Sequence, residues 1–320
     1  MFFEGSEKKA EIILSEQHTS LLSQYSDDFW AEMVRHCNAQ ILSSTRNSSV
    51  TAYLLSESSL FVWKDRILIL TCGDTRLVDA VIYFLEQIDS ALVEQIIYQR
   101  KNEYCSHLQA SHVLDDTKKL ADFSPGKLLR FGELDAHHSY FYHMENNFQG
   151  DPEDRTYEVL IYNIDETISE RLTNQKQSNQ DFRQLLKLDQ IIPGFQIDDF
   201  VFEPFGYSLN AISGSDYLTI HLTPQQHNSY VSFESNLDLT QHLGLLLDIF
   251  APSSLDIISY NEPSFADKIK ANMPENYNLK ELAQDNLSCG YLVNYATYFK
   301  QQSQLNKPTT INLRGEYHAF

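Results

Sequence analysis

The chain has 320 residues and a mass of 37.0 kDa, which is enough for two ordinary domains or one large one. A hydrophobic fraction of 42% excludes a disordered or fibrous chain, because that much apolar surface can build a substantial core. The 44 acidic residues outnumber the 24 basic ones and give a formal net charge of -20, which excludes general binding to nucleic acid or to an anionic membrane.

The first residues and the cysteines indicate the compartment. Charges at Glu4, Glu7 and Lys8 interrupt any apolar signal segment, and no apolar run approaches the roughly 20 residues of a membrane-spanning helix. The four cysteines follow no secretory signal and lack the spacing of a metal site, which predicts reduced thiols. They are Cys37, Cys72, Cys105 and Cys289. We therefore expect a cytoplasmic protein.

Short segments rich in β-branched and aromatic residues predict strands along much of the chain. They are Thr51–Leu55, 60–62, Arg66–Thr71, 156–164, 217–223, 229–234 and 255–260. Several of them follow one another as hairpins, which favours antiparallel sheets. A parallel doubly wound fold is disfavoured, because strands and helices alternate irregularly and no glycine-rich phosphate loop is present.

Two amphipathic segments, 74–87 and 237–250, predict helices that cover the sheets. In the first, Leu77, Val81 and Leu85 lie on one face. Each helix follows a pair of strands, and the two units lie about half the chain apart, which indicates an internal duplication.

No linker rich in glycine or proline divides the chain into two units. The polar stretch 146–155 is predicted to be a loop, and 173–181 an exposed loop or the start of a helix. We therefore predict one domain over residues 1–320, an α+β sandwich of antiparallel sheets flanked by helices.

The polar segment Ser56-Glu57-Ser58-Ser59 lies between two apolar strands and has two interpretations. Taken alone it is typical of a hairpin turn. A chemical role is favoured by two other places, where Cys72 ends a strand before a helix and where His221 lies within a strand. A serine nucleophile is weak on its own and needs a base and an oxyanion environment.

Eight short motifs together carry a family resemblance. They are FFEGSEKK, YLLSESSLFV, LTCGDT, YQRKN, IPGFQID, FEPFGYSLN, YLTIHLTP and SYVSFESN, between Phe2 and about Pro252. After Pro252 the match is weaker, and YLVNYATYFK is its last segment. The sequence resembles the eukaryotic-type S-adenosylmethionine decarboxylase proenzymes. This resemblance implies a four-layer α/β/β/α sandwich of two antiparallel sheets, flanked by helices.

The resemblance implies that the chain cuts itself between Glu57 and Ser58. Attack of the serine hydroxyl on the preceding carbonyl turns the amide into an ester, and elimination and hydrolysis leave a pyruvoyl group at residue 58. The products are a β chain, 1–57, and an α chain, 58–320, of 263 residues. In this family two such heterodimers often pair.

Catalytic roles follow from the same motifs. The resemblance makes His221 the base of processing, with Ser208 assisting, and makes Cys72 the proton donor of decarboxylation. The pyruvoyl group from Ser58 forms a Schiff base with the substrate amine and acts as the electron sink, without pyridoxal phosphate or a metal. For Cys72 the alternative is a small buried hydrophobic residue, the usual fate of a free cysteine.

The substrate contacts also come from the resemblance. Phe3 and Phe202 match the two rings that sandwich the adenine, a place where a sulfonium would also be favoured. Gln225 stands where animal enzymes carry a glutamate that accepts both ribose hydroxyls, so ribose binding is predicted to be weaker. The other matching positions near the centre are Glu4, Glu7, Leu55 and Glu57.

A second acidic site is implied between the sheets, where animal enzymes bind putrescine. Its matching residues are Glu11, Asp154, Thr156, Glu158 and Glu234. Three positions depart from the pattern, because Leu70 replaces a lysine that relays charge to the active site, Ile97 an aromatic residue and Gln99 a serine. Unpaired inward carboxylates are costly, so we predict a site filled by a basic side chain or by water and no activation by putrescine.

Two other groups of conspicuous residues receive plainer interpretations. His137, His138 and His143 lack partners at ligand spacing and are predicted to lie at the surface or at a sheet edge, not in a metal site. The charged run 115–119 is predicted to be an exposed face.

These expectations lead to pyruvoyl-dependent decarboxylation of S-adenosylmethionine, which supplies the aminopropyl donor for spermidine and spermine. One alternative is decarboxylation of another amino acid, ornithine or arginine, although an adenine clamp of Phe3 and Phe202 disfavours it. Another is a non-catalytic activating subunit, which the presence of Ser58, Cys72 and His221 disfavours.

Overall fold

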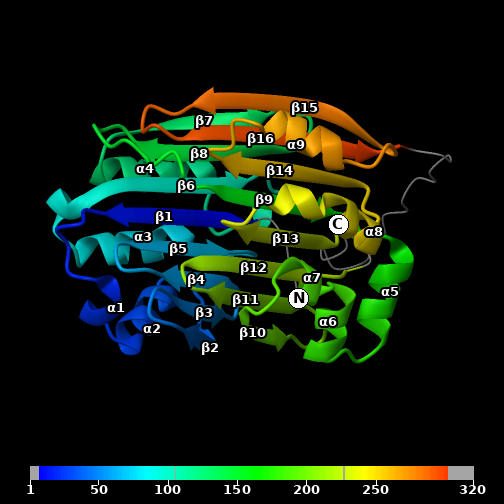
Figure 1. The fold of residues 1–320 in the computed structure, drawn as a ribbon. Helices are drawn as coiled ribbons and strands as arrows, with labels where there is room; N and C mark the ends of the chain where they lie inside the picture. The colour runs from blue at the N-terminus through cyan, green and yellow to red at the C-terminus, as the bar shows by residue number, and fades with distance from the viewer. Residues whose placement is uncertain (1–6, 105, 226–227, 302–320) are drawn as a thin grey trace.

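Two eight-stranded antiparallel sheets pack face to face in the computed structural model, which describes residues 7–104, 106–225 and 228–301 (Figure 1). The strands of the first sheet are β1 (Lys8–Leu14), β2 (Ile41–Arg46), β3 (Thr51–Leu55), β4 (Ser58–Val62), β5 (Arg66–Thr71), β6 (Val93–Lys101), β7 (Gly126–Gly132) and β8 (His138–Met144). The strands of the second are β9 (Thr156–Tyr162), β10 (Gln196–Val201), β11 (Tyr207–Ser213), β12 (Asp216–Thr223), β13 (Tyr230–Ser235), β14 (Ser254–Tyr260), β15 (Tyr277–Asn286) and β16 (Leu292–Lys300).

The two sheets have the same strand order. The first runs β2-β3-β4-β5-β1-β6-β8-β7, and the second runs β10-β11-β12-β13-β9-β14-β16-β15. Each position in the first sheet therefore recurs eight strands later in the second. This repetition confirms the predicted internal duplication and the antiparallel sandwich.

Helices cover the outer face of each sheet and complete four layers (Figure 1). The first sheet is covered by α1 (Leu21–Gln24), α2 (Asp27–Arg35), α3 (Leu77–Glu86) and α4 (Val113–Phe123). The second is covered by α5 (Glu166–Asn174), α6 (Asn179–Leu185), α7 (Leu188–Ile191), α8 (Leu243–Phe250) and α9 (Phe265–Asn272). None of these helices is long and apolar enough to cross a bilayer.

The predicted helices and loops are mostly confirmed, with shifted ends. The segment 74–87 contains α3, and 237–250 begins with a 3-10 turn, Leu239–His242, that leads into α8. The stretch 146–155 is irregular, as predicted. The stretch 173–181 holds the end of α5 and the start of α6, where Ser178 caps the helix with its side chain.

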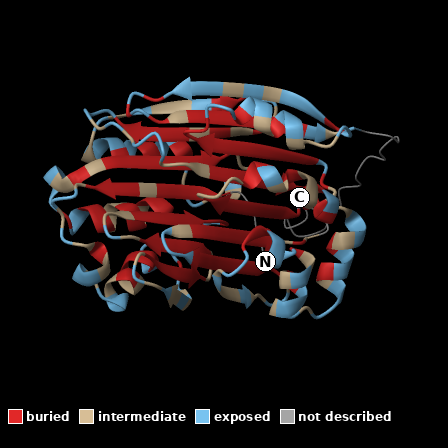
Figure 2. Ribbon diagram, viewed as in Figure 1, coloured by how far each residue is buried: buried red, intermediate tan, exposed pale blue. Residues whose placement is uncertain are grey.

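The central strand β1 divides its side chains between two environments. It pairs with β5 on one side and with β6 on the other. Ala10 and Ile12 pack with the helices over the first sheet, whereas Lys9 and Glu11 point between the two sheets. Figure 2 shows how fully the central strands are buried. The layer between the sheets therefore contains charged groups that must find partners inside the protein.

The predicted surface location of three histidines is wrong for two of them. His143 is fully buried. His137 is also buried, and Asp256 accepts a hydrogen bond from its Nδ1 at 3.0 Å. Only His138, at the start of β8, is half-buried at a strand end. Among the residues that the structure describes, no group of three or more potential ligands could hold a metal ion.

The charged run 115–119 is also less exposed than predicted. It lies in α4, where Asp116 and Thr117 face the first sheet. Asp116 is buried because it accepts hydrogen bonds from Tyr98 and Arg100 of β6. One residue of this charged run, Asp116, therefore forms a buried ion pair with Arg100.

Asp256 on β14 forms one of the ties between the two sheets. Its carboxylate lies 3.1 Å from Nζ of Lys101 on β6 and accepts a hydrogen bond from Thr297. Burial alone would raise the pKa of Asp256, but Lys101 and the hydrogen bonds from His137 and Thr297 hold that pKa below its ordinary value.

We expect Asp256→Asn to lower the free energy of unfolding by about 3–5 kcal/mol, because it leaves the Lys101 ammonium buried without a carboxylate. Urea unfolding at pH 7 measures the loss. Because the folded pKa of Asp256 is depressed, its contribution is present above the unfolded pKa of about 3.9 and declines as the pH falls through the folded value.

The matched control is Asp248→Asn, which changes an exposed carboxylate on α8. This variant should stay within about 0.5 kcal/mol of the parent. Equal effects of the two substitutions would show that Asp256 does not tie the sheets together.

Candidate active site

The turn between β3 and β4 presents one peptide carbonyl to two donors. The backbone N–H of Cys72 donates to the carbonyl oxygen of Glu57 at 3.0 Å, and the Cys72 thiol donates to the same oxygen at 3.3 Å. Cys72 reaches this place because it directly follows β5, which pairs with β4. Two donors on one carbonyl oxygen can stabilise negative charge that develops there, as an oxyanion hole does.

Ser58 follows that carbonyl and is buried in a strained backbone conformation. Its φ of 143° lies in a region that residues other than glycine rarely adopt, at a typical cost of about 1–3 kcal/mol. Only 2% of its surface is exposed. The backbone of Ser58 is therefore strained directly after the 57–58 peptide bond, and its hydroxyl lies beside that bond.

His221 lies opposite Ser58 on the second sheet. The Ser58 hydroxyl is 2.8 Å from Nε2 of His221, and the Ser208 hydroxyl is 2.8 Å from Nδ1. Ser208 on β11 is the direct cross-strand partner of His221 on β12, so the sheet itself fixes this pair. When Nε2 accepts from Ser58, the imidazole carries its proton on Nδ1 and donates it to Ser208.

Burial makes His221 a neutral base. It lowers the pKa of the imidazole to about 3, because a buried imidazolium would lose its hydration. At neutral pH, Nε2 therefore keeps a lone pair that can take the Ser58 proton. The hydroxyl of Thr219 lies 2.9 Å from the same nitrogen and helps to orient the ring.

The acidic groups of this centre are driven toward their protonated forms. Burial raises the pKa of Cys72 well above its ordinary value, and the nearby carboxylates of Glu57 and Glu7 raise it further. Burial likewise raises the pKa of Glu7 to about 8 and that of Glu57 to about 7. The Ser232 hydroxyl donates a hydrogen bond to Glu7. Cys72 thus holds a proton that it can deliver.

Other predicted site residues lie around this centre or outside the described chain. Leu55 is fully buried at the end of β3, and Phe202, just beyond β10, is half-buried. The Phe202 ring meets Phe200 edge to face at a centroid distance of 4.9 Å. Gln225 is half-buried after β12. Phe3 and Glu4 lie outside the described residues.

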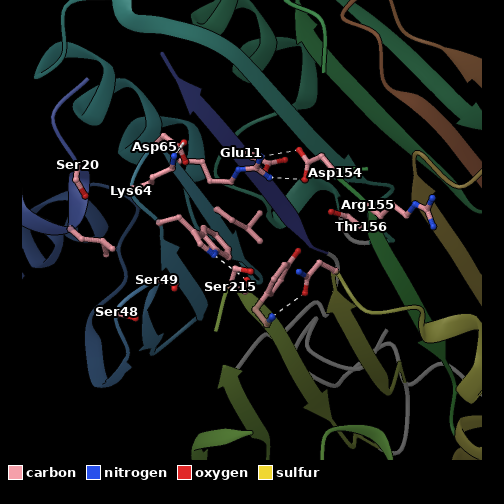
Figure 3. A pocket seen from close by; sticks show the side chains of 16 residues that line it. Glu11, Ser20, Ser48, Ser49, Lys64, Asp65, Asp154, Arg155, Thr156 and Ser215 are labelled. Carbon is pink, nitrogen blue, oxygen red and sulfur yellow. Dashed lines mark hydrogen bonds and ion pairs between the residues drawn. The ribbon is translucent and has the colours of Figure 1, made fainter. Parts of the chain in front are cut away.

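The predicted internal acidic site contains two basic side chains. Arg66 lies 2.9 Å from both Glu11 and Asp154, at a wall of a cavity of about 520 Å³ that Thr156 also lines (Figure 3). Deeper in the layer, Lys9 lies 2.9 Å from Glu158 and 2.9 Å from Glu234. Of the departures from the family pattern, Leu70 and Ile97 are buried apolar residues, and Gln99 donates to Glu158 at 2.7 Å.

The sequence prediction missed several polar residues of the site. Asn210 accepts a hydrogen bond from Ser59 at 2.6 Å, and Ser232 and Thr219 contact Glu7 and His221. Lys9 was also missed. A signal was available for Asn210 and Thr219. Polar residues occupy alternate positions along 207–213 and 217–223, and alternate positions of a strand face the same side, here the first sheet.

Comparisons with known proteins identify the family of this chain. Residues 1–301 match the model of the adenosylmethionine decarboxylase family. A protein of Trypanosoma cruzi, named S-adenosylmethionine decarboxylase proenzyme, is 29% identical over 96% of this chain and 91% of its own length. A protein of the same name from Leishmania donovani is 31% identical over 82% of this chain and 74% of its own length. The crystal structure of the Trypanosoma brucei AdoMetDC-delta26 monomer shares the fold, with a TM-score of 0.59 and 24% identity over 76% of this chain and 99% of that one.

We expect His221 to stay neutral far below the ordinary histidine range. In uncleaved Ser58→Ala protein, the ring resonances of His221, identified by their absence from Ser58→Ala/His221→Gln, should not shift between pH 7.5 and pH 5. The reason is the burial that lowers the pKa to about 3. Titration near the ordinary value of about 6.5 would contradict a neutral, dry base.

Proposed function

We propose that this chain, which belongs to the adenosylmethionine decarboxylase family, is a precursor that cuts itself between Glu57 and Ser58 and then decarboxylates S-adenosylmethionine. One observation carries the proposal: the Ser58 hydroxyl lies 2.8 Å from a neutral His221, beside a carbonyl that Cys72 holds with two donors. Nucleophile, base and oxyanion donors are thus in contact before any reaction.

The first step moves an acyl group from nitrogen to oxygen. Nε2 of His221 takes the Ser58 proton while Oγ bonds to the carbonyl carbon of Glu57, and Cys72 stabilises the oxygen that becomes negative. The carbon–nitrogen bond then breaks, the nitrogen takes up the proton, and an ester joins residues 57 and 58. A base then takes the Ser58 α-proton, and the Glu57 carboxylate leaves to give a dehydroalanine. Addition of water and release of ammonia turn the dehydroalanine into a ketone at position 58.

The residues around Ser58 fit a pyruvoyl group formed there. Such a group supplies a ketone that condenses with the substrate amine and withdraws electrons as carbon dioxide leaves. Cys72 would return a proton to the substrate carbon, because its raised pKa keeps the thiol protonated and it already lies beside residue 57. Phe202 and Gln225 are the described residues that we assign to the adenosine part.

The two products would remain one folded unit. The small chain would contribute β1, β2 and β3, of which β1 is central to the first sheet and pairs with β5 and β6 of the large chain. Pairing of two such heterodimers stays a prediction, and the exposed Leu279 and Leu282 on β15 offer apolar surface for it. We also propose a cytosolic location, which is supported by the free thiols of Cys37, Cys72 and Cys289.

We expect the purified protein to separate on a denaturing gel into chains of 57 and 263 residues. The intact mass of the larger chain should show a pyruvoyl group in place of Ser58. Ser58→Ala should remain one chain of 320 residues. The matched control Ser56→Ala, in the same turn, should cleave normally. Persistence of the unmodified protein as one chain after long incubation would contradict the proposal.

Carbon dioxide release from carboxyl-labelled substrates then tests the reaction itself. The cleaved protein should release label from S-adenosylmethionine and not from ornithine or arginine, which have no adenine to bind. The Cys72→Ser variant should turn over at least about tenfold more slowly, because its hydroxyl is a poorer acid for the substrate carbon. Release from arginine or ornithine alone would refute the assignment.

We further propose that free putrescine does not stimulate this protein. Each carboxylate of the internal acidic site already lies within 2.9 Å of a basic side chain, Arg66 or Lys9. Addition of putrescine should leave the cleavage rate and kcat within about twofold of their values in potassium chloride of the same ionic strength. A several-fold stimulation of either rate would refute this.

A further inference from the structure

The ammonium of Lys8 is buried among neutral oxygens on the helix side of the first sheet. Lys8 begins β1, and only 1% of its surface is exposed. Its Nζ donates to the backbone carbonyl oxygen of Gly73 at 2.7 Å and to the side-chain oxygen of Gln109 at 2.9 Å. Ala10 and Ile12, on the same face of β1, pack with the helices, so this contact lies outside the layer between the sheets.

This environment is costly for a positive charge. Three other buried cations, Lys9, Arg100 and Lys101, each lie within 3.1 Å of a carboxylate. Burial lowers the pKa of Lys8, and the nearby guanidinium of Arg100 lowers it further. An apolar side chain of similar length would avoid the loss of hydration, so a buried ammonium at this position needs a reason.

The carbonyl that Lys8 holds belongs to the turn that carries Cys72. Lys8 is the cross-strand partner of Thr71 on β5, and Cys72 and Gly73 follow Thr71 directly. Gly73 has a φ of 66°, in the left-handed region that glycine adopts at little cost. The hydroxyl of Thr75 donates to the carbonyl oxygen of Cys72 at 3.1 Å. Two successive carbonyls of this turn are therefore held by side chains.

The backbone of this turn sets the direction of both Cys72 donors. The N–H and the thiol of Cys72 meet the Glu57 carbonyl oxygen at 3.0 Å and 3.3 Å. The charge of Lys8 acts on the same thiol. Burial and the carboxylates of Glu57 and Glu7 raise the pKa of Cys72, whereas the Lys8 ammonium lowers it, because a nearby positive charge favours the thiolate.

We propose that Lys8 is a positioning residue that fixes the turn after Cys72 and so directs the Cys72 N–H and thiol at the reacting centre. It acts through Cys72 from behind the first sheet. After the proposed cleavage, Lys8 would belong to the small chain and Cys72 to the large one, so the small chain would still orient the proton donor. The inference rests on the proposed function, because its readouts are cleavage and decarboxylation.

The chain contains a matched control for this contact. Nζ of Lys300 donates to the backbone carbonyl oxygen of Ala251 at 3.1 Å, and Ala251 also has a positive φ, of 41°. Ala251 ends α8, which covers the second sheet, whereas Cys72 follows β5 of the first. Lys300→Met therefore removes the same kind of contact and leaves the turn of Cys72 intact.

The first experiment replaces Lys8 by methionine, which keeps the length of the side chain and removes its charge and its donors. Cleavage, followed on denaturing gels during cell-free synthesis, should slow on the order of tenfold or more, because the donors to the Glu57 carbonyl lose their alignment. In the cleaved protein, kcat should fall on the order of tenfold with KM within about threefold, since Cys72 delivers a proton and does not hold the adenosine. Lys300→Met should leave both rates within about twofold of the parent.

A double-mutant cycle separates this role from a general loss of structure. In a Cys72→Ala background, Lys8→Met should change the residual kcat by less than about twofold, because the thiol through which Lys8 acts is already absent. A general loss of structure would lower kcat by the same factor in both backgrounds.

Lys8→Gln covers the case in which Lys8→Met does not fold, as judged by circular dichroism and urea unfolding. It removes the charge and shortens the reach to Gly73, so it should slow cleavage and lower kcat in the same direction. The inference is overturned if either folded variant cleaves and turns over like the parent. It is also overturned if Lys8→Met lowers kcat equally with and without the Cys72 thiol.

The parent protein separates this inference from the proposed function. A parent that neither cleaves nor releases carbon dioxide would refute the function itself. A parent that does both, with rates that ignore the side chain at position 8, would refute only the role of Lys8.

Discussion

The contact between Ser58 and His221 joins two different sheets, and much of the structure serves to keep it at 2.8 Å. Neither sheet can hold this distance alone, because each contributes one partner. Other polar ties cross the same layer between the sheets, from Glu7 to Ser232 and from Lys101 to Asp256. A misplacement of about 1 Å can cost a reaction roughly a hundredfold, so these ties matter for chemistry as well as for folding.

Burial explains the electrostatics of this layer. Removal from water favours the neutral form of every group, so one cause lowers the pKa of His221 and raises the pKa values of Cys72 and Glu7. A neutral base and protonated acids can therefore coexist at one pH. The carboxylates of the internal acidic site pair with Arg66 of β5 and Lys9 of β1.

Local patterns in the sequence predicted part of the two sheets, the strands β3, β4, β5, β9, β12, β13 and β14, and the family motifs pointed to the proposed catalytic residues. Strand-like segments such as Arg66–Thr71 are short and β-branched, and the motifs around Ser58 and His221 are specific. The partner of Lys9 could not be found in this way, because Glu158 is 149 residues away and only the packing of two sheets brings them together. The buried state of His137 and Asp116 was missed for the same reason, since Asp256 and Arg100 come from other elements.

The duplicated architecture would hold the two products of the proposed self-cleavage together. Ser58 begins β4, and His221 lies on β12, which occupies the same position in the second sheet. The proposed cleavage site, between Glu57 and Ser58, lies in the turn before β4, so a cut there would break no ladder hydrogen bond of β1, which pairs with β5 and β6. After cleavage, Lys9 on the small chain would face Glu158 and Glu234 on the large one. These ion pairs would then help to hold the two products together.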